Sequence, residues 1–159
     1  MKKQFLLALA TLGVLAGCTG CIHRQGTNQP VTPFEQVLVW NDVLAQTNNH
    51  ISRGIIAMSP SVVAPAKAIE VLRAQKNLAV IDEQITTILK QGPDAAKQNS
   101  AALQSLLDQL SQSATILVDS GAIGVKNPET QRTFDADVQI ISTLAGNILS
   151  GLRQAGIIH

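Results

Sequence analysis

The sequence predicts an all-α fold, an antiparallel up-down-up-down four-helix bundle, from three observations. Between residues 32 and 159, apolar side chains recur at steps of three and four, which is the spacing of one helix face. Proline and glycine divide this stretch into four segments of similar length. The best strand-like pattern, Ala122–Val125, is only a few residues long and lies among glycines. The chain of 159 residues therefore has room for one helical domain.

The first two predicted helices are bounded by prolines and a glycine. Thr32-Pro33-Phe34-Glu35 fits a capping box, with Thr32 as N-cap and Pro33 at the first helical position, and the helix should end at Ser59-Pro60. Its predicted buried face is Val37, Trp40, Leu44, Ile51, Ile55 and Met58. The second helix should begin near Pro65 and end at Gly92. Its predicted buried face is Val71, Ala74, Leu78, Ile81, Ile85 and Ile88.

The last two predicted helices follow the same rules. The third should begin at Pro93 and stop at Gly121, burying Ala96, Leu103, Leu107, Leu110, Ala114 and Leu117. The fourth has Asn127 as N-cap, Pro128 at its first position and Gly156 as its stop. Its predicted buried face is Phe134, Val138, Ile141, Ala145, Ile148, Leu152 and Ala155. Each helix is about 39 Å long. The short connections imply antiparallel neighbours.

The amino-terminal segment has the layout of a secretory signal peptide. Lys2 and Lys3 precede an apolar run, Phe5–Ala16, that is too short to span a bilayer. The next residues, Leu15-Ala16-Gly17-Cys18, resemble the lipobox of bacterial lipoproteins. That resemblance implies a signal peptide over 1–17, a diacylglyceryl thioether on Cys18 and acylation of its new amino group. An ordinary signal peptide cut nearby, with Cys18 a structural thiol, is the alternative.

Residues 18–31 are expected to be the lipidated cysteine and a flexible tether, followed by the helical domain over 32–159. Gly20, Gly26 and Pro30 interrupt the segment, which has no apolar period. In the lipoprotein family Thr19, rather than Asp, implies the outer membrane, facing the periplasm, in a Gram-negative bacterium. Cys21 lacks the upstream aliphatic residue of a lipobox and has no assigned role.

Composition and motifs argue against nucleic-acid binding and against catalysis. The net charge is +1, Tyr is absent and Trp occurs once, so neither a basic face nor an aromatic platform is expected. The histidines His23, His50 and His159 form no H-x-x-x-H or E-x-x-H pair, and no metal site is predicted. A haem between Met58 and His159 would need ligands from opposite ends of the bundle. We therefore expect no cofactor beyond the covalent lipid on Cys18, and no enzyme.

The few charged side chains suggest separate structural roles. His50 should lie at a polar edge of the first helix, level with about Val138. Asp82 and Glu83 are adjacent and should point to different faces. Asp135 and Asp137 are expected to favour the amino-terminal end of the fourth helix electrostatically.

Only 14% of the residues are charged, and the third helix has an uncharged polar face. Its members are Gln98, Asn99, Ser100, Gln104, Ser105, Gln109, Ser111, Gln112 and Ser113. Such a face can pack on another protein without stripping many charges of water. The sequence thus predicts a lipid-anchored, non-enzymatic cell-envelope protein that presents a helical bundle as an interaction module, with the membrane and an envelope protein as candidate partners. A carrier that binds a small apolar ligand between the helices is the alternative.

Overall fold

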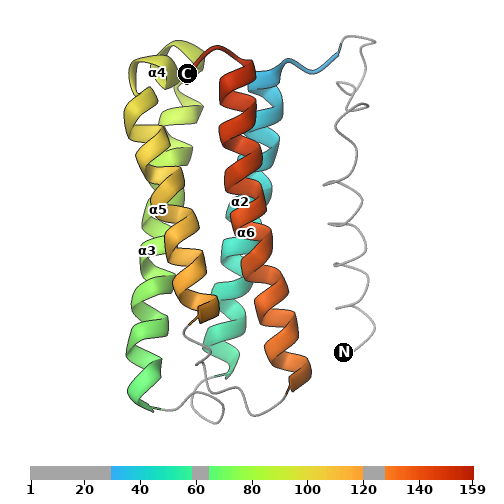
Figure 1. The fold of residues 1–159 in the computed structure, drawn as a ribbon, viewed down its shortest axis with the longest axis vertical. Coiled ribbons are helices and arrows are strands. Elements are labelled where there is room, and N and C mark those ends of the chain that lie inside the picture. The colour runs from blue at the N-terminus through green and yellow to red at the C-terminus, as the bar shows by residue number, and fades with distance from the viewer. Residues whose placement is uncertain (1–29, 59–64, 120–127) are drawn as a thin grey trace. The chain divides into compact units, whose positions relative to one another are not determined.

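The computed structural model describes residues 30–58, 65–119 and 128–159, and the elements in these ranges are α-helices (Figure 1). They are α2 (Pro33–Met58), α3 (Pro65–Lys90), α4 (Pro93–Gln98), α5 (Ser100–Asp119) and α6 (Pro128–Gln154). The predicted all-α class is confirmed for this part of the chain. A division between compact units falls at Thr32/Pro33, and all five helices belong to the second unit. The predicted signal peptide and most of the tether, with Cys18 and Cys21, lie outside the described residues.

Proline begins most of these helices, and glycine follows two of them. Four of the five helices begin at a proline, which tolerates the first helical position because its missing N–H would have no helical partner there. After α3, Gly92 adopts a φ of 100°. After α6, Gly156 adopts a φ of 68°, a left-handed conformation that side chains disfavour. These are the start and stop signals that the sequence predicted.

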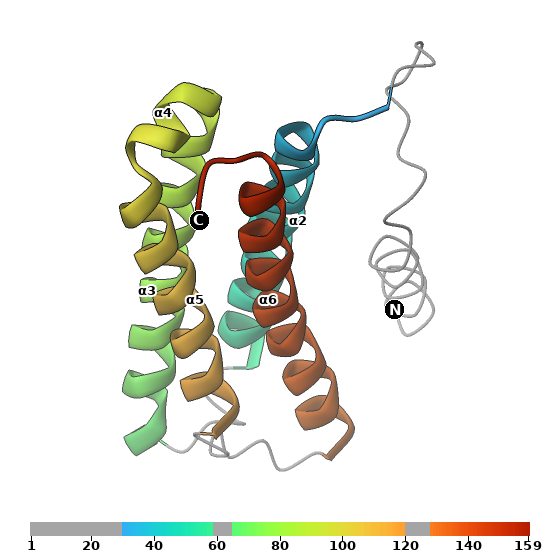
Figure 2. The same ribbon diagram turned by 45° about the horizontal axis from the view of Figure 1, so that its top comes forward.

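The third predicted helix is broken, because Asn99 separates α4 from α5. Asn99 ends α4 with φ −104° and ψ 22°, and its side-chain amide donates a hydrogen bond to the Ala95 carbonyl over 2.9 Å. A short amide side chain competes in this way for backbone carbonyls. The prediction of one continuous helix here was wrong. The short α4 lies where α3 ends and α5 begins (Figure 2).

The buried core consists mainly of the predicted aliphatic positions. All six predicted positions of the third segment are buried, from Ala96 to Leu117, and so are six of the seven predicted for the fourth segment. Trp40, Ile88 and Ala155 are only partly buried and pack against the core. The side chains of Ile55, Met58 and Val71 lie outside the described set. The helical periodicity therefore identified the inward face of each described helix.

Four buried aliphatic residues were not predicted, and two of them follow the last helix. These four are Leu89, Leu144, Ile157 and Ile158. The Gly156 N–H donates to the Arg153 carbonyl and the Ile157 N–H to the Leu152 carbonyl, at 3.0 and 2.9 Å. This pair of bonds is a Schellman motif, which turns the chain back and brings its next residue against the last helical turn. Ile157 and Ile158 thereby cover one end of the core.

The four long helices pack in a fixed set of neighbouring pairs. α2 contacts α6 and α3, and α5 contacts α3 and α6 (Figures 1 and 2). Contacts between α2 and α6 occur in opposite order along the two helices, since Trp40 lies against Gly151 whereas the later His50 lies against the earlier Asp137. α2 and α6 are therefore antiparallel.

Candidate functional site

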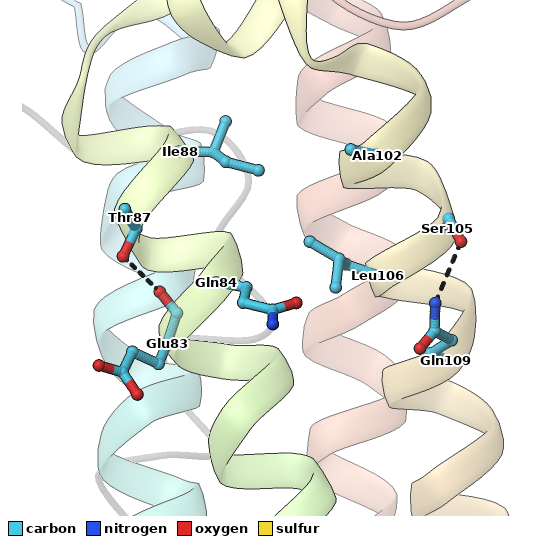
Figure 3. A pocket seen from close by; sticks show the side chains of 8 residues that line it. All are labelled: Glu83, Gln84, Thr87, Ile88, Ala102, Ser105, Leu106 and Gln109. Atoms are coloured by element: carbon cyan, nitrogen blue, oxygen red, sulfur yellow. Dashed lines mark hydrogen bonds between the residues drawn. The ribbon is translucent and has the colours of Figure 1, made fainter.

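A groove of about 590 Å³ lies between α3 and α5 and is the candidate functional site (Figure 3). It is lined by Glu83, Gln84, Thr87, Ile88, Ala102, Ser105, Leu106 and Gln109. Figure 3 shows Ile88 pointing from α3 towards α5 and Leu106 pointing back towards α3. Both side chains are half-buried, so the centre of the groove is apolar but remains accessible.

The rim of the groove is polar and has little charge. On the α5 side the Gln109 amide donates to the Ser105 hydroxyl over 3.1 Å. On the α3 side the Thr87 hydroxyl donates to the Glu83 backbone carbonyl over 2.8 Å. Glu83 provides the single formal charge among the lining side chains. A partner could therefore bury the apolar centre and exchange hydrogen bonds with the rim at a small desolvation cost.

The structure brings two residues of the predicted polar face into this groove. Ser105 and Gln109 line it, whereas the other members of that face, such as Gln98 and Gln112, do not. The α3 wall was not predicted. Ile88 was assigned to the core, and the sequence does not show which flank of its helix faces α5.

A second group of polar side chains is buried between α2 and α3. Asn41, Asn48 and Asp82 are all less than 9% exposed. The Asn41 amide donates to the Thr86 hydroxyl over 2.8 Å. The Oδ1 atoms of Asn41, Asn48 and Asp82 have no hydrogen-bond partner within the described part of the chain. This group was not predicted from the sequence.

Burial dominates the ionisation of Asp82. Removal from water raises the pKa of its carboxyl from 3.8 to about 6, although a hydrogen bond with the Asn48 side chain opposes part of the rise. Its neighbour Glu83 is exposed, so the prediction that the two point to different faces is confirmed. The charged form of Asp82 is thus disfavoured by the fold.

His50 and Asp137 meet between α2 and α6, with His50 Nδ1 3.5 Å from Asp137 Oδ2, and they form an ion pair when the imidazole is protonated. Burial raises the pKa of the Asp137 carboxyl, while the charge and hydrogen bond of His50 lower it. The predicted level of His50, near Val138, is confirmed. The expected role of Asp137 at the helix start was wrong, because α6 begins at Pro128 and the dipole effect acts mainly within the first turn.

Neither polar group assembles a metal centre in the described residues. No three His, Cys, Asp or Glu side chains there gather closely enough to hold an ion. Of the helices built from described residues, none is both long and apolar enough to cross a bilayer.

No protein-family model, curated protein or solved structure matches the chain.

Proposed function

We propose that this protein is a lipid-anchored, non-enzymatic component of the bacterial cell envelope whose helical domain is a protein-interaction module. The observation that carries the proposal is the α3/α5 groove, with its apolar centre at Ile88 and Leu106 and its nearly uncharged rim. The lipobox-like Leu15-Ala16-Gly17-Cys18 supports a diacylglyceryl anchor on Cys18. In a Gram-negative cell, Thr19 favours the outer membrane, with the domain facing the periplasm.

For the domain, we infer an up-down-up-down four-helix bundle made by α2, α3, α5 and α6. The antiparallel register of α2 and α6 supports it, as does the pairing of each long helix with two neighbours. Asn41 faces Thr86 and the later Asn48 bonds the earlier Asp82, which supports an antiparallel α2 and α3. In this arrangement α4 is a short helix within the connection from α3 to α5.

The anchor is tested by replacing Cys18 with Ser and labelling cells with radioactive palmitate. The variant should lose the label and move from the membrane to the soluble fraction, because a thioether cannot form on a hydroxyl. Cys21→Ser is the matched control and should keep both the label and the membrane fraction. A Cys18→Ser protein that is still labelled would contradict the anchor.

The groove is tested with a photo-crosslinking residue at Gln109, on its rim, and at Thr143, which is exposed on α6. In intact cells, position 109 should give one discrete protein adduct that Leu106→Glu abolishes, because a carboxylate in the apolar centre must be desolvated when a partner binds. Position 143 should give none. Equal adducts at both positions, or an adduct insensitive to Leu106→Glu, would contradict an interaction site in the groove.

A carrier of a small apolar ligand is the second candidate, favoured by the facing side chains of Ile88 and Leu106. It predicts a bound small molecule in native mass spectra of the membrane-purified protein and no adduct at position 109. Leu106→Glu should then release that molecule.

A further inference from the structure

Large apolar side chains are exposed on one helix of the domain. Four such residues are exposed among the described side chains: Val39, Ile69, Leu72 and Val80, and the last three belong to α3. Ile69 is 64% exposed, Leu72 50% and Val80 43%. Single exposed apolar residues are ordinary, but a group on one face marks an interaction surface.

Helical geometry places these three residues on one strip with two cations. At about 100° per residue, Ile69, Leu72, Arg73, Lys76 and Val80 fall within an arc of about 100° and span about 16 Å along the axis. Arg73 and Lys76 are both exposed. We call these five residues the amino-terminal face of α3. No carboxylate occurs among the described side chains between Ile69 and Val80, and the side chain of Glu70 lies outside that set.

An anionic lipid surface matches this combination of groups. Aliphatic side chains enter the boundary between headgroups and acyl chains, while Lys and Arg reach out to lipid phosphates along their apolar stems. Each cation near an anionic membrane strengthens binding about fivefold. We propose that the amino-terminal face of α3 docks on the surface of an anionic membrane.

This docking surface adds to the proposed anchor and lies before the groove along α3. The anchor only brings the domain to a membrane, whereas the face would determine which side of the domain lies against it. The fourteen residues from Cys18 to the start of the domain reach at most about 48 Å, more than the length of one helix, so the tether would permit this orientation. The groove uses residues Glu83–Ile88 of α3, which begin about one helical turn beyond Val80.

The test measures contact between lipid and single tryptophans in the full chain. Trp40, the one natural tryptophan, is replaced by Phe, and Leu72→Trp is introduced. The protein is reconstituted in vesicles of brominated phosphatidylcholine with one-third phosphatidylglycerol. We expect the bromine to quench at least half of the fluorescence at position 72. Thr143→Trp, at an exposed position of α6, is the matched control and should not be quenched.

Removal of the two positive charges should reverse this outcome. Arg73→Gln with Lys76→Gln should weaken docking about 30-fold and restore most of the fluorescence at position 72. An unquenched position 72, equal quenching at positions 72 and 143, or quenching unaffected by the loss of both cations would overturn the proposal. Palmitate labelling of the same protein shows separately whether the Cys18 anchor is present, so failure of docking and failure of the anchor are distinguishable.

Discussion

Gly151 shows how one residue sets the distance between two helices. A Cβ atom at this position would lie 2.6 Å from Val37 Cγ2 and 2.8 Å from Trp40 Cζ3. These separations are shorter than real Cβ contacts, so α2 and α6 pack against each other over the bare glycine backbone. Glycine costs about 1 kcal/mol relative to alanine in a helix, and the close packing of Val37 and Trp40 offsets this cost.

We predict that Gly151→Ala destabilises the domain although alanine is the better helix former. Overpacking of this kind costs about 1–3 kcal/mol, which exceeds or matches the gain of about 1 kcal/mol in helix propensity. Gly146→Ala is the matched control on the same helix, since nothing lies within 4 Å of its added Cβ. It should stabilise by up to about 1 kcal/mol. Urea unfolding measures both, and equal effects of the two substitutions would contradict the predicted contact.

At the scale of helices, the buried polar group joins α2 to α3. Asn41 and Asn48 alternate with Val37, Leu44 and Ile51 at steps of four and three, so the sequence holds the signal that both asparagines face inward. Both asparagines are polar, so the pattern of apolar residues does not include them. A buried carboxyl beside them makes the contact between these two helices sensitive to pH.

We predict that the protein becomes less stable as pH rises from about 4 to 7. Asp82 has a folded-state pKa of about 6 against an ordinary 3.8, so within this window the native chain binds more protons than the unfolded chain. Below the pKa that Asp82 has in the unfolded chain, the buried carboxyl does not lower the free energy of unfolding. Above the pKa that it has in the folded chain, the loss reaches at most about 3 kcal/mol. Asp82→Asn removes this cost.

The measurement compares unfolding free energies of the wild type and Asp82→Asn at several pH values. The variant's advantage should grow from pH 4 to pH 7, and contributions from Asp137 and the exposed carboxyls cancel in the difference. Glu83→Gln, next in the chain but exposed, should leave the profile unchanged. A pH-independent difference between wild type and Asp82→Asn would show that the carboxyl is not desolvated in the fold.

At the scale of the whole molecule, local signals predicted much of the fold and only part of the candidate site. Periodicity identified inward faces because a helix repeats its face every 3.6 residues, and prolines located starts because their φ suits a first turn. The break at Asn99 and the burial of Ile157 were not predicted, because neither depends on a helical period. At Asn99 a side-chain amide competes for a backbone carbonyl, and Ile157 lies in a turn beyond the last helical residue. The groove was not predicted for another reason. Its α3 wall depends on which helix packs beside α3, and the sequence does not show that this helix is α5.

The relative direction of α2 and α6 can be tested, and the result bears on the arrangement of the entire bundle. If α2 and α6 are antiparallel, a short bis-maleimide should link His50→Cys to Asp137→Cys, since the natural side chains approach to 3.5 Å. The background is Cys18→Ser with Cys21→Ser, so that the introduced thiols are the only ones. His50→Cys with Arg153→Cys is the matched control, because Arg153 lies about 24 Å further along α6. Peptide mass spectrometry should find the first link and not the second; a link only to position 153 would require a different register and would refute the up-down-up-down arrangement.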